Sequence, residues 1–452
     1  MKRTTDMTIG NPLSLIIRFA FPLLITNLGQ QLYMIADASI VGRGVGIKAL
    51  ASVGSADWIY WLVLWTVMML TQAFSTFVAR NFGEKNFEMM NKTIANSAML
   101  CIISGIFLTA GGLLISKPLL VLLDTPTDII DGSSLYLHTM ISGTLIVTAY
   151  NMAASILRAL GDGKTPLIAM IISALMNIGL DLIFVFVFKW GIFGAAIASV
   201  ISQFFSFLYC LLKILRTDTI KIEKHHWIPD INLVNKLLTF AIPLALQYII
   251  INFGGIVLQS TINAEGSIFV AGFTATNKLY GLLECSAISL GTAFTTYFSQ
   301  NYGAGNFKRV KQGHKCAVLL STIAACVIML LVLFTGKHLL KLFLDITSQD
   351  GEMAFVIAWK YLKIMSFCLV ILYLIYVYRS LMQSAGDSFW SFISGIAEFF
   401  VRAGMAKIII LILGTEVLFF AEPLAWLAAL LFVMIPYFIK EKSLYGDNLN
   451  NQ

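Results

Sequence analysis

Long apolar runs separated by short polar links are the dominant pattern of this chain. Each run of about 20 residues or more is long enough to cross a hydrocarbon core about 30 Å thick. The pattern predicts an all-α polytopic membrane protein of about twelve spans, because a membrane β-barrel would show short alternating segments instead. The expected spans are 12–40, 47–79, 91–116, 133–158, 166–188, 192–213, 234–262, 267–300, 314–335, 352–382, 389–413 and 417–440.

Composition and motifs narrow the possible functions. Of the 452 residues, 58% are hydrophobic and 12% are charged, about half the charged fraction of soluble domains. The net charge of +7 lies mainly in the short links, so no nucleic-acid partner is expected. The sequence lacks a GxxxxGK[ST] phosphate loop and an HExxH zinc motif. We therefore expect neither an enzyme nor a cofactor.

The basic residues of the links predict the orientation in the membrane. Links that follow even-numbered spans carry more lysine and arginine than the links between them. The link after the sixth span, for example, contains Lys213, Arg216, Lys221 and Lys224. The positive-inside rule then places both termini in the cytoplasm of a multi-pass plasma-membrane protein.

Two sequence patterns recur after about 220 residues. Asn81-Phe82-Gly83 returns as Asn301-Tyr302-Gly303, and Phe19-Ala20-Phe21-Pro22 returns as Phe240-Ala241-Ile242-Pro243. Each half therefore holds six spans. An even number returns the chain to the same side, so the halves are parallel repeats. The predicted organisation is an N-terminal lobe (1–215), a cytoplasmic linker (216–232), a C-terminal lobe (233–440) and a cytoplasmic tail (441–452).

The first span carries an acid in its apolar interior. Gln30, Tyr33, Met34 and Asp37 have i, i+3, i+4, i+7 spacing and share one helix face. A carboxylate at this depth costs about 2.5–3.5 kcal/mol on insertion scales and usually faces a cavity or a partner. Pro22, earlier in the same span, predicts a kink because it removes a helix hydrogen bond.

Spans five and six offer partners for Asp37. Asn177 and Asp181 are four residues apart on span five, as are Ser199 and Gln203 on span six. If these side chains converge, they form an oxygen-only site with two acids, which suits Na⁺ or a proton. The alternatives are that Asp37 faces water near Arg43 and that Asp181 caps span five and faces water near Lys189.

Three further charges lie within apolar runs of the second half. Glu284 in span eight is a candidate for a second cation or substrate site, or it pairs with Lys278 or a neighbouring polar group. Glu398 and Arg402 in span eleven are four residues apart and predict an internal ion pair.

The chain resembles the multidrug and toxic compound extrusion (MATE) family, in its DinF-like branch. The resemblance rests on the stretch from Pro22 to Gly42, the two Asn-Phe/Tyr-Gly loops, the Leu-Arg-Ala-Leu-Gly-Asp-Gly-Lys-Thr-Pro turn at 157–166 and the 6+6 layout. It implies a cation site at Asp37, Asn177, Asp181 and Ser199, with Tyr33 beside it and Pro22 as the bending proline. The acids of the NorM branch are missing, because span seven has none and Leu372-Tyr373 stand in span ten.

The resemblance implies a secondary antiporter working by alternating access. It would export amphipathic, mostly cationic organic compounds in exchange for H⁺ or Na⁺, as a monomer embedded in the lipid bilayer. Gln30, Met34, Gln203 and Glu284 are the candidates for lining its substrate cavity. The alternative function is a lipid-linked oligosaccharide flippase of the same superfamily.

Overall fold

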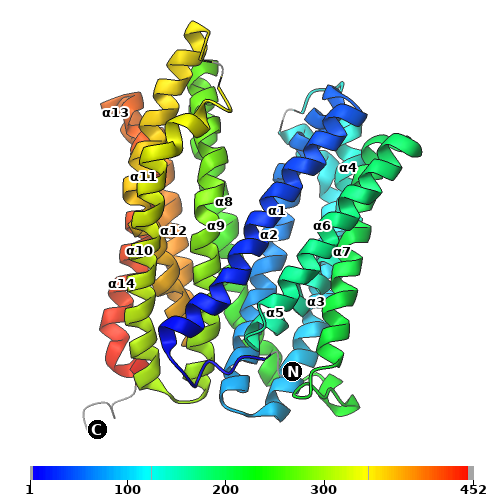
Figure 1. Ribbon diagram of the computed structural model, residues 1–452, viewed down its shortest axis with the longest axis vertical. Helices are drawn as coiled ribbons and strands as arrows, with labels where there is room; N and C mark the ends of the chain where they lie inside the picture. Colours follow the sequence, from blue (N-terminus) through cyan, green and yellow to red (C-terminus); the bar gives the residue numbers. More distant parts are fainter. Residues whose placement is uncertain (1–3, 124, 345, 446–452) are drawn as a thin grey trace. The chain divides into compact units, whose positions relative to one another are not determined.

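The computed structural model describes residues 4–123, 125–344 and 346–445, so most of the predicted tail lies outside the described residues. Every regular element within these ranges is helical (Figure 1). The elements of the first half are α1 (Pro12–Gly44), α2 (Ile47–Gly83), α3 (Phe87–Leu122), α4 (Ile130–Ser142), α5 (Thr144–Ala159), α6 (Lys164–Asp181), η1 (Leu182–Val187) and α7 (Gly191–Leu215). After η2 (Lys224–Trp227) follow α8 (Ile231–Ala264), α9 (Ser267–Gly303), α10 (Phe307–Leu340), α11 (Gln349–Ser384), α12 (Phe389–Gly404), η3 (Met405–Ile409), α13 (Ile410–Leu413), η4 (Thr415–Val417) and α14 (Leu418–Tyr445).

Each predicted span coincides with one helix or with consecutive helical segments. Nine helices of the described ranges are long and apolar enough to cross a bilayer, or ten when the bent pair α4–α5 counts as one span. The predicted span 133–158 is not straight, since it bends by 47° between α4 and α5. At this break a Cβ on Gly143 would lie 2.5 Å from Val200 Cγ2, so α7 packs too closely for a larger residue.

The helix packing repeats between the two halves. In the first half, α2 packs on α3 and α5, and α7 packs on α5 and α6. In the second half, α9 packs on α10 and α11, and α14 packs on α11 and α12. These pairs join corresponding spans, which confirms the prediction of two six-helix repeats.

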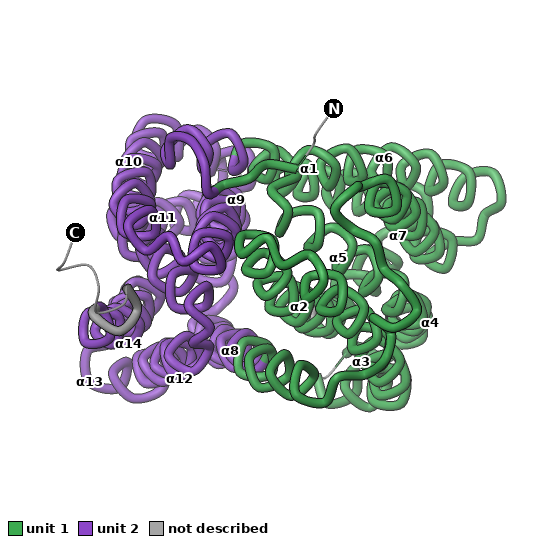
Figure 2. Tube along the Cα trace, turned by 90° about the horizontal axis from the view of Figure 1, so that it is seen from below, with its two compact units in different colours: residues 1–7, 21–245 green, residues 8–20, 246–452 purple. Residues whose placement is uncertain are grey.

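The chain divides into two compact units, coloured separately in Figure 2. Unit 1 comprises residues 1–7 and 21–245, and unit 2 comprises 8–20 and 246–452. The divisions at 20/21 and 245/246 lie inside α1 and α8, close to Pro22 and Pro243. They do not coincide with the predicted lobe boundary at the linker 216–232, which stays a prediction from the sequence.

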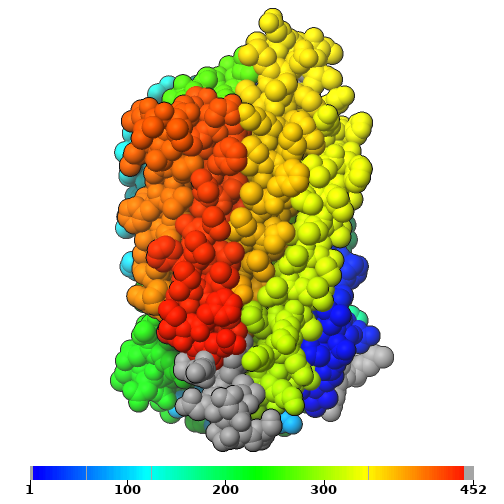
Figure 3. All heavy atoms as spheres, turned by 90° about the vertical axis from the view of Figure 1, so that its left-hand side faces the viewer, coloured from blue at the N-terminus to red at the C-terminus, as the bar shows by residue number. Residues whose placement is uncertain are grey.

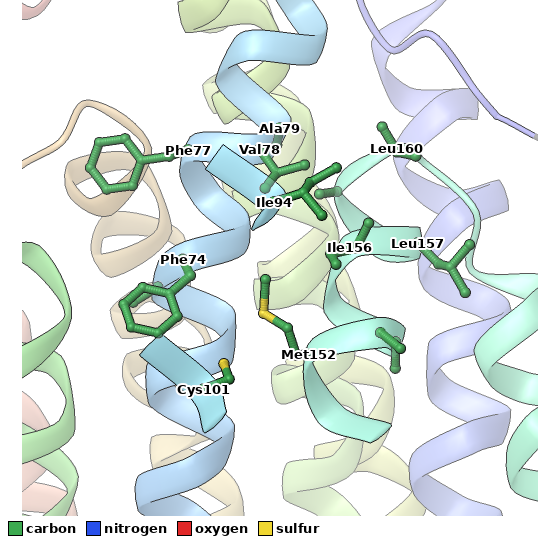
Figure 4. Packing of buried hydrophobic residues seen from close by; sticks show 14 of the residues in the cluster. Phe74, Phe77, Val78, Ala79, Ile94, Cys101, Met152, Ile156, Leu157 and Leu160 are labelled. Carbon is green, nitrogen blue, oxygen red and sulfur yellow. The ribbon is translucent and has the colours of Figure 1, made fainter. Parts of the chain in front are cut away.

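Unit 1 has an apolar core between α2, α3 and α5. Phe74 and Phe77 of α2, Ile94 of α3, and Met152 and Ile156 of α5 are all buried in it (Figure 4). Fully burying one such side chain contributes about 1.5–3 kcal/mol where water is the alternative.

Unit 2 shows the surface expected of a lipid-facing helix. The face in Figure 3 includes α14, drawn in red, beside α12. Its large apolar side chains remain exposed along the helix, among them Phe420, Leu424, Phe432, Ile435 and Ile439. A continuous exposed apolar surface of this kind is stable in contact with lipid tails.

Candidate functional site

Side chains from three helices of unit 1 converge on one polar cluster. Tyr33 and Asp37 come from α1, Asn177 and Asp181 from α6, and Ser199 from α7. Asn177 Nδ2 donates a hydrogen bond to Ser199 Oγ at 3.1 Å, and Tyr33 Oη lies 3.4 Å from the same Ser199 oxygen. The sequence predicted all five residues for this site.

The carboxyl groups of Asp37 and Asp181 lie close to each other in this cluster and interact electrostatically. Two carboxylates at close range repel each other, so protonating one of them or binding a cation beside them is favourable. Asp181 is 0% exposed, which excludes the alternative that it faces water near Lys189.

The chain after Asp181 holds this acid in place. Asp181 is the last residue of α6, and the π-helical turn η1 follows directly. Turns of this type occur frequently at functional sites. Phe184 of η1 packs against Trp190, with ring centroids 4.9 Å apart, and Trp190 N donates to Phe184 O at 2.8 Å. This compact aromatic turn keeps Asp181 inside the unit.

The proline predicted as a hinge lies in α1 without interrupting it. Pro22 is buried, and α1 continues as a helix from Pro12 to Gly44. The Thr26 hydroxyl donates to Pro22 O at 2.8 Å. Such side-chain bonds to the i−4 carbonyl accompany bending of helices. The helix is therefore locally weakened two to three turns before Tyr33.

The predicted cavity residues of unit 1 lie around the cluster without joining its described hydrogen bonds. Gln30 and Met34 of α1 are half-buried, as is Gln203 of α7. Gln203 Oε1 is buried without a hydrogen-bond partner among the described residues. These three side chains stay candidates for substrate contact.

Two tyrosines near the cluster were missed by the sequence analysis. Tyr60 of α2 lies close enough to Tyr33 to interact with it electrostatically. Tyr136 of α4 is buried and interacts in the same way with Asp37 and Tyr33. Asp57, one turn before Tyr60, interacts with both tyrosines. The spacing of Asp57 and Tyr60 on one helix face was the available signal.

The donor set of this cluster fits a proton or a small hard cation. Two carboxyl groups, an amide and two hydroxyl groups supply oxygen atoms and no nitrogen or sulfur base. One oxygen of Asp37, Oδ1, is buried and has no hydrogen-bond partner among the described residues. A buried carboxylate oxygen without a donor is the position at which a cation or a proton would be stabilised.

The second acid candidate, Glu284, lies in unit 2. Tyr376 Oη of α11 donates to Glu284 Oε1 at 3.1 Å, and Tyr280, one turn earlier on α9, lies near the same carboxylate. Of the two partners in the alternative prediction, Lys278 is not among the described ion pairs, whereas Tyr376 is the neighbouring polar group that bonds to Glu284. Glu284 therefore lies among phenol groups.

A buried ion network in unit 2 confirms and extends the predicted Glu398–Arg402 pair. Arg402 Nη2 lies 2.9 Å from Glu398 Oε1 and 2.6 Å from Glu422 Oε2. Arg379 Nη2 lies 3.0 Å from the other oxygen of Glu398. Two guanidinium groups thus alternate with two carboxylates, so the network is neutral when all four are ionised.

Comparison with known proteins identifies the family. The family model described as MatE matches residues 22–183 and 243–408, once in each half of the chain. This chain belongs to the MatE family. It is therefore a transporter rather than an enzyme, and a multi-pass membrane protein, as the sequence predicted.

Individual relatives of this MatE transporter agree with the match. The chain is 29% identical over 398 residues to the probable multidrug resistance protein YpnP of Bacillus subtilis, with 88% of each chain covered. It is 23% identical over 425 residues to the multidrug export protein MepA of Staphylococcus aureus, with 93% of each covered. A solved MOP superfamily transporter from Pyrococcus furiosus has the same fold, with a TM-score of 0.89 at 21% identity over 99% of this chain and 100% of that one.

Proposed function

We propose that this transporter exports amphipathic, mostly cationic organic compounds by antiport, with Asp37 and Asp181 as the site of the coupling ion. The observation that carries the proposal is the proximity of the two carboxyl groups, one from α1 and one from α6. Because protonation of one of two adjacent acids relieves their repulsion, we take H⁺ as the coupling ion, with Na⁺ as the alternative. The names of the relatives YpnP and MepA support multidrug export as the class of transport.

In the proposed cycle, the ion and the substrate are bound at different stages. Protonation of the Asp37–Asp181 pair removes negative charge from the cluster, and loss of the proton restores it. The weakened helix around Pro22 lets α1 respond to this change. The substrate can drive the cycle only if the protonated and the deprotonated states of the protein bind it with different affinities.

The buried charges of unit 2 favour organic cations over the flippase alternative. A flippase for a pyrophosphate-linked lipid needs basic groups available to bind the anion. Arg379 and Arg402 are instead bonded to Glu398 and Glu422. Glu284, which accepts a hydrogen bond from Tyr376, would supply charge compensation to a cationic substrate, and tyrosine rings suit flat cations.

The test is dye transport by the purified protein in proteoliposomes under an imposed pH gradient and, separately, an imposed Na⁺ gradient. Wild type is compared with Asp37→Asn, Asp181→Asn and Asp128→Asn. Asp128 pairs with Lys48 on the exposed surface and controls for the same chemical change. We expect transport driven by the pH gradient, lost in the first two variants and retained in the third. Transport by Asp37→Asn at the wild-type rate would refute the proposed coupling site.

A further inference from the structure

The link between α7 and α8 is fastened to the beginning of α3 by buried asparagines. Asn91 Oδ1 accepts a hydrogen bond from the Lys221 backbone N–H at 3.2 Å. Asn96 Nδ2 donates to His226 O at 3.3 Å, and Asn96 Oδ1 accepts from the Asp230 backbone N–H at 3.1 Å. All these residues belong to unit 1. The link is therefore a docked segment.

An ion pair extends this docking to the first turn of α8. Lys92 Nζ lies 2.7 Å from Asp230 Oδ2. The other oxygen of Asp230 accepts from the backbone N–H groups of Asn232 and Leu233, at 3.0 and 3.1 Å, and so caps α8. The start of α8 is thus connected to α3 through a single carboxylate.

A cluster of two histidines and one glutamate lies beside this ion pair. Glu88 Oε1, at the start of α3, lies 2.8 Å from His225 Nε2 and 3.0 Å from His226 Nε2. The two imidazole rings are adjacent, with centroids 4.0 Å apart. His226 is 1% exposed, whereas His225 and Glu88 are exposed. Nothing in the proposed transport cycle uses these three side chains.

The hydrogen bonds of His226 distinguish a proton site from a metal site. The ligand atoms of Glu88, His225 and His226 lie within 4.8 Å of one another, close enough to surround a metal ion. However, His226 Nδ1 accepts the Glu223 backbone N–H at 2.8 Å. A neutral imidazole that accepts at Nδ1 carries its proton on Nε2. The nitrogen facing Glu88 therefore has no lone pair for a metal.

We propose that Glu88, His225 and His226 form a proton-operated latch between the α7–α8 link and α3. When His225 is protonated, the latch holds this link, and with it the first turn of α8, more firmly to α3. Histidine is the side chain that normally changes charge between pH 5 and 8. Protonation turns the Glu88–His225 contact into a charge-assisted hydrogen bond. The latch is independent of the proposed function.

The surroundings direct the proton to His225. A proton on His226 Nδ1 would break the bond from the Glu223 N–H, and the ring is buried. Protonating both rings would place two positive charges within contact distance. The Glu223 carboxylate lies 3.5 Å from His225 Nδ1, so each ring nitrogen of His225 faces a carboxylate. The charged and titratable groups facing the latch are Glu88 and Lys92 from α3, and Glu223, His225, His226 and Asp230 from the link.

Hydrogen–deuterium exchange of the full-length protein in detergent tests the latch. Peptides covering 219–233 are followed at pD 6 and pD 8, with EDTA present, and rates are divided by the intrinsic rates at each pD. We expect protection in wild type to be about two- to five-fold higher at pD 6, as for an exposed ion pair. Glu88→Gln and His225→Gln should lower protection at pD 6 to the level at pD 8. Glu84→Gln, an exposed glutamate at the end of α2, should behave as wild type.

Each of the following outcomes would contradict the proposed latch. An unchanged pD dependence in both Glu88→Gln and His225→Gln would mean that other groups titrate. Protection of wild type that rises with added Zn²⁺ and falls with EDTA would mean that the cluster binds metal. Equal loss of protection at both pD values in the variants would mean that the contact stabilises the link equally whether or not His225 is protonated. Peptides of α3 report whether each variant remains folded.

Discussion

Asn177 and Ser199, on neighbouring helices of unit 1, are joined by a 3.1 Å hydrogen bond from amide to hydroxyl. Tyr33 meets the same hydroxyl from α1. Ser199 thus links three helices directly beside the Asp37–Asp181 pair. One small polar side chain connects α6, which carries one acid of the proposed ion site, to α1, the helix that contains Pro22.

Replacing Ser199 by alanine should reduce transport more than it reduces stability. The change leaves the Asn177 amide without its acceptor, which costs about 1–3 kcal/mol locally and loosens the cluster. We expect the initial rate of gradient-driven dye transport to fall about ten-fold or more, with partial recovery in Ser199→Thr. Ser202→Ala is the matched control, because its hydroxyl bonds to Ala198 O of its own helix. Equal losses in both alanine variants would contradict a specific role for Ser199.

Replacing the interior prolines of α1 and α8 by alanine should slow transport without unfolding the protein. Pro22→Ala returns an N–H to the interior of α1, and Pro243→Ala does the same in α8. The stiffer helices should raise or maintain the melting temperature and lower the transport rate several-fold. Pro12→Ala is the control, because Pro12 begins α1, where an N–H has no helix partner. Full activity of both interior variants would show that these prolines are not hinges.

Removing Glu398 should destabilise unit 2 strongly. Glu398→Gln removes the carboxylate that pairs with both Arg379 and Arg402, and leaves Glu422 paired with Arg402. Breaking a buried ion pair costs about 3–5 kcal/mol. The melting temperature in detergent should fall clearly. Glu416→Gln removes an exposed carboxylate paired with Lys360 and should change stability by about 0–1 kcal/mol. A Glu398 variant as stable as the Glu416 variant would contradict the described network.

The Asp230 cap predicts a contribution to stability at neutral pH that is lost in acid. The hydrogen bond from Lys92, together with the backbone N–H groups of α8, holds the pKa of Asp230 below its usual value. A carboxyl group with a depressed pKa in the folded state stabilises above its unfolded pKa, about 3.9, and the contribution disappears as pH falls through the folded value. Asp230→Asn should therefore lower the melting temperature at pH 7, and the difference from wild type should shrink between pH 5 and pH 3. Asp218→Asn, an exposed position in the same link, should show no such trend.

The sequence predicted the helices and the main site because both depend on local patterns. Twelve apolar runs have the length of a membrane span, and Asn177 and Asp181 share a helix face at i and i+4. Tyr136 was missed because it comes near the cluster from α4, and no periodicity reports which helices pack together. Glu422 was missed because the partner of Arg402 lies 20 residues away on another helix. The break at Gly143 depends on how closely α7 approaches, which is also a tertiary property.

The division of α1 and α8 between the two units has a consequence for biosynthesis. Residues 8–20 are made before residues 246–452, with which they form unit 2. The first turns of α1 must therefore wait for the second half of the chain before they reach their final surroundings. Separate expression of the halves, cut within the linker 216–232, would leave unit 2 without its first segment and remove residues 233–245 from unit 1. Unit 1 thus needs the chain only as far as residue 245, whereas unit 2 cannot be completed until residues 246–452 join residues 8–20.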